Sequence, residues 1–172
     1  MQWFCPECWR EVDETERLCS ACGALLSELD SKSFAEKAIA ALRHPEPATS
    51  VRAAEILGKL KPPCAVAALT EVLKGSRDPY LLEAAARALG EIGDPTSVST
   101  LRPVLRSSYL VARIAAAEAL GKIASGEAVQ ALEAARADTS PAVRSAIDRC
   151  LASLRASRVP RIASVRKNPE ES

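Results

Sequence analysis

The chain has 172 residues and a formal net charge of +1, and 48% of its residues are apolar, which is enough to build a core. Aromatic residues amount to only 3%, whereas 32 Ala and 19 Leu dominate the apolar set and favour closely packed helices over sheets. This balance excludes a uniformly cationic nucleic-acid binder, and no apolar run reaches the about 18 residues of a transmembrane helix. The acidic, cysteine-rich start of the chain is unlike a signal peptide, so we expect a cytoplasmic protein.

Four of the six cysteines form two Cys-x-x-Cys pairs near the start of the chain, with ten residues between the pairs. Two thiolates at this spacing can bind one ion from a single tight turn, so two such turns complete a tetrahedral site typical of zinc. Four thiolates leave no open coordination position, which favours one structural Zn²⁺ over a catalytic ion. Two disulfides or a redox-active pair are the alternatives. The predicted metal ligands are Cys5, Cys8, Cys19 and Cys22.

The two cysteine motifs, CPEC at 5–8 and CSACG at 19–23, resemble the short double zinc ribbons found at the N-termini of many prokaryotic proteins. The resemblance covers residues 3–26 and implies a bound metal, although Trp9 stands where those ribbons usually have Gly. We expect a short hairpin in the spacer between the pairs and a left-handed turn at Gly23. Three aromatic residues either cap this small ribbon or form a contact surface for a partner: Trp3, Phe4 and Trp9.

An internal repeat with a period of 31 or 32 residues follows the cysteine-rich head. Three segments align without gaps, AAEILGKL (53–60), AARALGEI (85–92) and AAEALGKI (116–123), and a degenerate fourth copy covers 146–154. A fixed period of this length is typical of stacked supersecondary units. Each unit contains the same anchoring leucine: Leu57, Leu89, Leu120 and Leu151.

Each period predicts two helices, because apolar residues recur at helical spacing and Gly and Pro breakers stand between the helical segments. The expected first helices cover 33–43, 64–74, 96–106 and 127–136. The expected second helices cover 49–60, 80–92, 109–123 and 141–155. Alanine clusters in the second helices allow these helices to approach closely. Pro103 predicts a kink in the first helix of the third repeat.

The three aligned segments, together with the Val143-Arg144 pair of the last repeat, resemble HEAT repeats of the short type found in phycobilisome-lyase-like proteins. The resemblance covers residues 33–156 and implies a mostly α fold, a right-handed α-solenoid of four HEAT-like helix pairs. Such arrays usually present an extended surface to a partner macromolecule. We therefore expect the solenoid to bind a protein partner.

Catalytic motifs are missing from the sequence. Its one histidine, His44, precedes Pro45 in a predicted turn, and neither a phosphate-binding Gly-rich loop nor a Ser/His/Asp set can be assembled. We interpret Cys64 and Cys150 as buried small hydrophobic residues. The sequence thus predicts a non-catalytic adaptor for macromolecular recognition, not an enzyme, with no evident small-molecule substrate.

Two alternatives from other functional classes stay open. A nucleic-acid-associated factor would use the ribbon together with the basic tail, and its binding would weaken steeply with salt. A bilin-lyase-like enzyme is implied by the HEAT-like resemblance, since members of that family attach chromophores to protein thiols.

Charged residues in the second helices alternate in sign from repeat to repeat when the helices are aligned on their leucines. One row contains Glu55, Arg87, Glu118 and Arg149, and the row four residues on contains Lys59, Glu91, Lys122 and Ser153. We expect ion pairs between repeats along the concave face of the array, and one pair within each of the first three second helices: Glu55–Lys59, Arg87–Glu91 and Glu118–Lys122. A face that neutralises its own charge favours a protein partner over nucleic acid.

The chain ends in a basic segment, which we interpret as a disordered tail, with a phosphate tether or a contact with the acidic head as alternatives. The last repeat is expected to be the least stable, because its second helix needs a polar outer face. The predicted organisation is a zinc ribbon over 1–26, a linker over 27–32, a HEAT-like solenoid over 33–156 and a flexible basic tail over 157–172.

Overall fold

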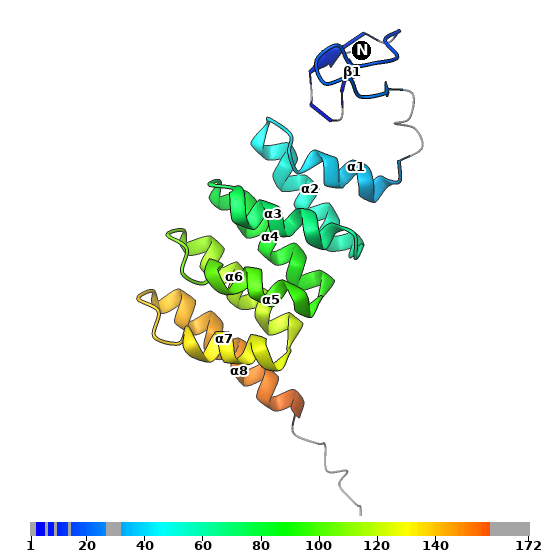
Figure 1. Ribbon diagram of the computed structural model, residues 1–172. Coiled ribbons are helices and arrows are strands. Elements are labelled where there is room, and N and C mark those ends of the chain that lie inside the picture. Colours follow the sequence, from blue (N-terminus) through cyan, green and yellow to red (C-terminus); the bar gives the residue numbers. More distant parts are fainter. Residues whose placement is uncertain (1–2, 6, 9, 14, 27–31, 159–172) are drawn as a thin grey trace, which may run out of the picture.

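A computed structural model describes residues 3–5, 7–8, 10–13, 15–26 and 32–158 of the chain. Within these residues, eight α-helices form four pairs that stack one on the next beyond a small N-terminal head (Figure 1). The first helices are α1 (Phe34–Ala41), α3 (Ala65–Gly75), α5 (Val98–Val104) and α7 (Gly126–Ala134). The second helices are α2 (Pro47–Leu60), α4 (Pro79–Ile92), α6 (Leu110–Ile123) and α8 (Pro141–Arg158). The expected mostly helical solenoid is confirmed.

The helices begin where the local sequence can satisfy the free backbone N–H groups of a first turn. Ser33 and Glu36 form a reciprocal capping box at the start of α1. The Asp78 carboxylate accepts hydrogen bonds from the Tyr80 and Leu81 N–H groups at the start of α4. Pro occupies the first position of α2, α4 and α8, where its missing N–H costs nothing.

Helix α5 differs most from its prediction. A 3₁₀ turn (Pro95–Ser97) leads into it, and the helix ends at Val104, one residue after Pro103. Pro103 therefore lies in the last turn and does not kink the middle of a longer helix. Because proline has no N–H to donate to the carbonyl four residues earlier, the helix cannot propagate normally through this position.

The core lies between the two helix layers and consists almost entirely of Leu, Ala and Val. The anchoring leucines Leu57, Leu89 and Leu120 are fully buried, and Leu151 is 3% exposed. Burying a leucine is worth roughly 1.5–3 kcal/mol, so the periodic leucines account for much of the stability of the stack. The repeat motif is thus a packing motif.

The second helices approach one another very closely. A Cβ atom added at Gly90 would lie 2.6 Å from the Ala119 Cα atom, and one added at Gly58 would lie 3.0 Å from the Ala88 Cα atom. The first helices contact each other much less than the second helices do. An array with one tight and one loose layer curves toward the tight layer, so we infer that the second helices line its inner, concave side.

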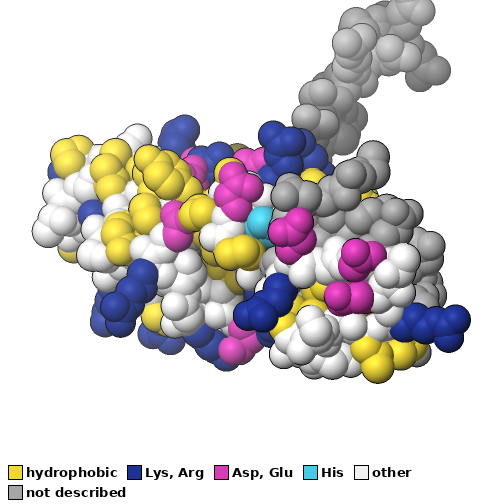
Figure 2. All heavy atoms as spheres, turned by 90° about the horizontal axis from the view of Figure 1, so that it is seen from above, with side chains coloured by type: hydrophobic (Ala, Val, Ile, Leu, Met, Phe, Trp, Pro, Cys, Tyr) yellow, Lys and Arg dark blue, Asp and Glu magenta, His cyan; other side chains and the backbone are white. Residues whose placement is uncertain are grey.

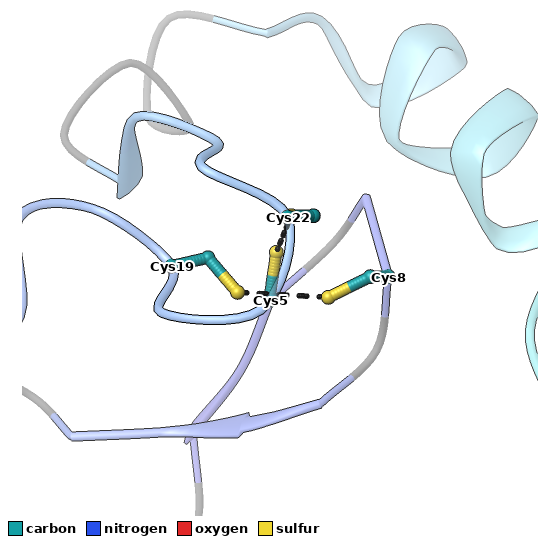
Figure 3. A group of neighbouring side chains, drawn as sticks. All are labelled: Cys5, Cys8, Cys19 and Cys22. Atoms are coloured by element: carbon teal, nitrogen blue, oxygen red, sulfur yellow. Dashed lines mark hydrogen bonds between the residues drawn. The ribbon is translucent and has the colours of Figure 1, made fainter.

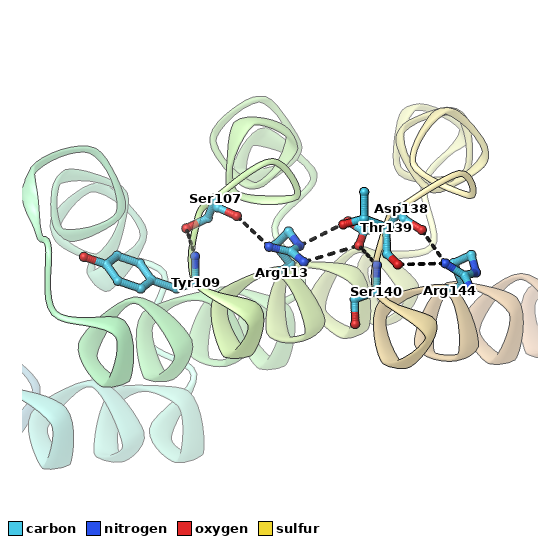
Figure 4. A network of polar contacts seen from close by, with 7 residues as sticks. All are labelled: Ser107, Tyr109, Arg113, Asp138, Thr139, Ser140 and Arg144. Atoms are coloured by element: carbon cyan, nitrogen blue, oxygen red, sulfur yellow. Dashed lines mark hydrogen bonds and ion pairs between the residues drawn. The ribbon is translucent and has the colours of Figure 1, made fainter.

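A polar network joins the third repeat to the fourth (Figure 4). The Arg113 guanidinium on α6 lies 3.1 Å from the Asp138 carboxylate in the turn before α8, and it donates to the Ser107 carbonyl at 2.9 Å. Asp138 also accepts from the Ser140 N–H at 2.7 Å. Both charged side chains are largely buried, so this pair fixes the register of the last repeat.

The head contains a two-stranded antiparallel sheet formed by β1 (Trp3–Phe4) and β2 (Glu11–Val12). The strands flank the first cysteine pair, so the prediction of a hairpin within the spacer between the pairs is wrong. The tight turn of the first motif reverses the chain earlier than expected. An ion pair of 2.5 Å between Glu7 and Lys32 links the head to the start of the solenoid. No helix among the described residues is long and apolar enough to cross a membrane.

Candidate functional site

The backbone of the head brings the two cysteine pairs together. The Cys5 N–H donates to the Arg10 carbonyl at 2.8 Å, and the Cys19 N–H donates to the Ala24 carbonyl at 2.9 Å, which closes one tight turn around each pair. Gly23 has a φ of 74°, the left-handed conformation expected at this position. Both turns present their sulfur atoms to the same point.

The four sulfur atoms lie within 4.8 Å of one another (Figure 3). The Cys5 and Cys22 sulfurs are 3.6 Å apart, and the Cys8 and Cys19 sulfurs are 3.5 Å apart. These separations are well beyond the ~2.05 Å of a disulfide bond. Cys5 and Cys19 are buried, whereas Cys8 and Cys22 are exposed. The residues named from the sequence are therefore brought together, and they could hold one metal ion.

The electrostatics of the cluster favour a cation. Hydrogen bonds from the Ala21 and Cys22 N–H groups lower the pKa of Cys19 to about 6. The Ala24 N–H favours the Cys22 thiolate, but partial desolvation of the sulfur and the neighbouring thiols outweigh it and raise the pKa of Cys22 to about 12. Thiolates this close cannot all ionise by themselves. A bound divalent cation compensates the repulsion between the thiolates, because a thiol that coordinates a metal ion loses its proton.

The aromatic residues of the head lie outside what the structure describes, since Trp9 and the side chains of Trp3 and Phe4 are not placed. The predicted basic tail over 157–172 likewise lies outside the described residues, except for its first two residues, which belong to the end of α8. Two other apolar side chains of the head, Leu18 and Leu25, pair across an isolated β-bridge and are 55% and 42% exposed.

The charge ladder on the second helices forms between repeats. Glu118 on α6 lies 3.9 Å from Arg87 and 3.8 Å from Arg149, so it joins α4 to α8. Glu91 on α4 lies 2.9 Å from Lys61 and 2.5 Å from Lys122, so it joins the end of α2 to α6. The expected ladder between repeats is confirmed by three of these contacts, those of Glu118 with Arg87 and Arg149 and that of Glu91 with Lys122.

The expected pairs within the helices are wrong. Among the described residues, none of the three predicted pairs forms, and Arg87 instead contacts Glu83 at 3.0 Å on the preceding turn. Lys61 takes the place expected for Lys59, because the chain turns left-handed at Lys61 (φ 53°) after α2 ends. The two lysines lower the pKa of Glu91 to about 2, Lys122 having the larger effect.

A hollow of about 680 Å³ lies on this face between α2 and α4. Val51, Tyr80 and Ala84 contribute apolar walls, and charged residues of the two rows surround them. Tyr80 is 67% exposed at the start of α4, although most large apolar side chains of the solenoid are buried. Periodicity alone did not single out Tyr80, because its repeat equivalents are not aromatic. The hollow can accept an apolar side chain of another molecule.

The remaining candidates have structural roles. The His44 imidazole Nδ1 accepts from the Glu46 N–H at 3.0 Å, as befits a turn residue. Cys64 is exposed, so its prediction as a buried residue is wrong; it stands in the turn just before α3, outside the repeating apolar stripe. Cys150 is half-buried against Gly121, and burial raises the pKa of its thiol.

Comparisons with known proteins agree with this architecture. The family model for HEAT repeats matches residues 35–113, and the model for the PBS lyase HEAT-like repeat matches residues 112–138. No curated protein matches the chain. One similar solved structure is the complex of CpcE and CpcF of phycocyanin lyase from Nostoc sp. PCC7120, with 25% identity and a TM-score of 0.57. The match covers 82% of this chain and only 59% of that chain.

The prediction that the chain is not an enzyme is contradicted, because the chain is similar to a structure from a phycocyanin lyase complex and contains a match to the PBS lyase HEAT-like repeat. The missing catalytic motifs did not justify that prediction, since a reaction carried out by a complex need not leave a complete catalytic set in one chain. The comparisons give no support to the nucleic-acid alternative. Together the two family models match residues 35–138, so the comparisons find HEAT-type repeats over most of the solenoid.

Proposed function

We propose that this chain is the HEAT-like component of a lyase-type complex and that it acts by binding another protein. The observation that carries the proposal is the likeness in fold to a chain of the phycocyanin lyase complex, together with the PBS lyase HEAT-like repeat in the third and fourth units. That solved complex contains two different proteins, which supports a protein partner for this chain as well.

The proposed contact surface is the face of the second helices. Its charged rows neutralise one another, so the face presents no excess charge that would select a strongly charged partner. Exposed apolar side chains stand beside the rows at the starts of α4 and α6: Tyr80, Leu110 and Val111. In Figure 2, apolar side chains gather on the left, the side on which Figure 1 shows the turns between first and second helices. A neutral ladder beside an apolar patch suits a protein interface.

The head has a structural part in this proposal. The donor set of Cys5, Cys8, Cys19 and Cys22 suits a single Zn²⁺ that folds the ribbon over 1–26 and does no chemistry. The linker at 27–32, the solenoid at 33–156 and the tail at 157–172 complete the proposed organisation. A reducing, cytoplasmic location would keep the four thiols available to the metal.

The proposal is tested by isolating the tagged chain from its host, producing the recovered partner by itself, and titrating the two proteins against each other by calorimetry. Tyr80→Ser should weaken binding about tenfold or more, as loss of an interface aromatic commonly does. Phe34→Ser is the matched control, since Phe34 is 63% exposed but lies on a first helix. Equal affinities for wild type and Tyr80→Ser, or no stoichiometric partner, would refute the proposal.

A further inference from the structure

Helix α5, the first helix of the third repeat, lies in a stretch of chain that has no acidic residues. No Asp or Glu occurs between Asp94 and Glu118, and the stretch contains three arginines. Arg113 is neutralised by Asp138, as described above. Arg102 on α5 and Arg106 just after it are exposed and form no ion pair in the described part of the chain. They are four residues apart, so they lie on one side of this short segment.

Two hollows flank α5 on the outer layer of the solenoid. The hollow toward α7 has a volume of about 620 Å³ and is lined by both arginines. The hollow toward α3 has a volume of about 760 Å³ and contains Lys74 and Arg77. Its walls also include hydroxyl groups, from Ser76, Ser99, Thr100, Ser107 and Ser108. Both hollows therefore offer hydrogen-bond donors and positive charge around a single helix.

Asp138 is the one acid among the described residues that line the two hollows, and it is already engaged. The Asp138 carboxylate accepts from Arg113 and from the Ser140 N–H, so it does not neutralise the arginines of α5. Glu71 pairs with Lys74 at 3.0 Å, which leaves Arg77 without an ion-pair partner among the described residues. A favourable contact with the helix dipole accounts for one cation at the end of α5, but not for three on this surface. Figure 2 shows Lys and Arg side chains gathered along its lower left edge.

We propose that this cationic surface, formed by Arg77, Arg102 and Arg106 around α5, binds an extended acidic segment of a partner protein. The two faces of the solenoid then recognise different features, since the second helices neutralise their own charge and the outer layer does not. The flanking hollows have room for carboxylate side chains on both sides of α5, and the hydroxyl groups can donate to them. Among the described residues that line the two hollows, the one aromatic side chain, Tyr109, is half-buried against the core, so little ring surface is open for stacking with nucleic-acid bases, which favours an acidic peptide over a single strand.

The test uses the full chain and a fluorescein-labelled peptide of alternating Glu and Ser, followed by anisotropy at several salt concentrations. The variant Arg102→Gln/Arg106→Gln removes two charges from the surface. The control Arg52→Gln/Lys59→Gln removes two exposed charges from α2 that also form no ion pair in the described residues. Both variants have the same net charge, and circular dichroism establishes that both are folded.

The peptide should bind the α5 variant about fivefold more weakly than wild type, and the control within about twofold of wild type. Binding of the wild type should also weaken with salt. Equal losses in the two variants would overturn the proposal, because they would show attraction to net charge only. The absence of peptide binding would also overturn it. Tighter binding of a single-stranded oligonucleotide of equal charge, lost in the α5 variant, would assign the surface to nucleic acid instead.

Discussion

Replacing Gly90 by Ala tests whether the close approach of the second helices holds the solenoid together. The new Cβ atom would lie 2.6 Å from the Ala119 Cα atom and 2.8 Å from its Cβ atom. One of these is a backbone atom, so no side-chain rotation relieves the clash and α4 must move away from α6. Overpacking of this kind costs about 1–3 kcal/mol, and contact with the backbone puts Gly90 at the upper end.

The same substitution also has a favourable part. Alanine is a better helix former than glycine by about 1 kcal/mol, which offsets part of the clash. We therefore expect Gly90→Ala to lower the free energy of unfolding by about 2 kcal/mol. For a solenoid of this size the midpoint of thermal unfolding should fall by about 8 °C, measured by circular dichroism.

Gly75→Ala is the matched control. Gly75 is the last residue of α3, and a Cβ atom there would meet nothing within 4 Å. This variant should be as stable as wild type or up to about 1 kcal/mol more stable. Gly58→Ala, with a nearest contact of 3.0 Å, should fall between the two. If Gly90→Ala and Gly75→Ala unfold at the same temperature, tight packing of the second helices does not limit stability.

Three further predictions concern two ion-paired sites in the solenoid and the metal site of the head. Because the pKa of Glu91 is lowered from 4.5 to about 2, its ion pairs stabilise the fold above pH 4.5 and are lost as the pH falls toward 2. Since Glu91 is 39% exposed, Glu91→Gln should cost only about 1 kcal/mol at neutral pH and nothing at pH 2, measured by urea unfolding. Arg113→Met should cost about 3 kcal/mol by leaving Asp138 buried and unpaired, and Asp138→Asn in the same chain should recover part of the loss; a fully additive double variant would contradict this. Removing metal with a chelator should shift tryptophan emission, since both tryptophans belong to the head, and should leave helical circular dichroism nearly intact; protein purified under reducing conditions without one bound metal per chain would contradict the site.

The periodic residues predicted the solenoid well, because stacked repeats make local pattern and global packing the same problem. Leu57, Leu89 and Leu120 are buried as expected, and most helix bounds lie within two residues of their predicted positions. The glycine after each of these leucines was part of the same motif. The repeat pattern does not reveal that this glycine lets neighbouring second helices approach closely, because glycine has no side chain that could contribute to an apolar stripe.

What could not be predicted depends on geometry between repeats. The partner of Glu91 is Lys61 and not Lys59, because the left-handed turn that ends α2 redirects the chain. Arg87 has acids on both sides, and only three-dimensional positions decide which of them it contacts. The clustering of the four cysteines was predictable because their spacing is local. The link to a lyase was predicted only as an alternative, because it rests on the HEAT-like resemblance and on no catalytic residue of this chain.

The proposed function is best tested by the rate of the reaction that the proposed complex, isolated from the host, carries out. Following the implied lyase chemistry, the assay measures covalent attachment of a bilin to an added cysteine-containing acceptor protein, with and without this chain. We predict that the rate falls at least about tenfold when the chain is omitted, and that wild type restores it while Tyr80→Ser does not. An unchanged rate without the chain would contradict a role in a lyase-type complex.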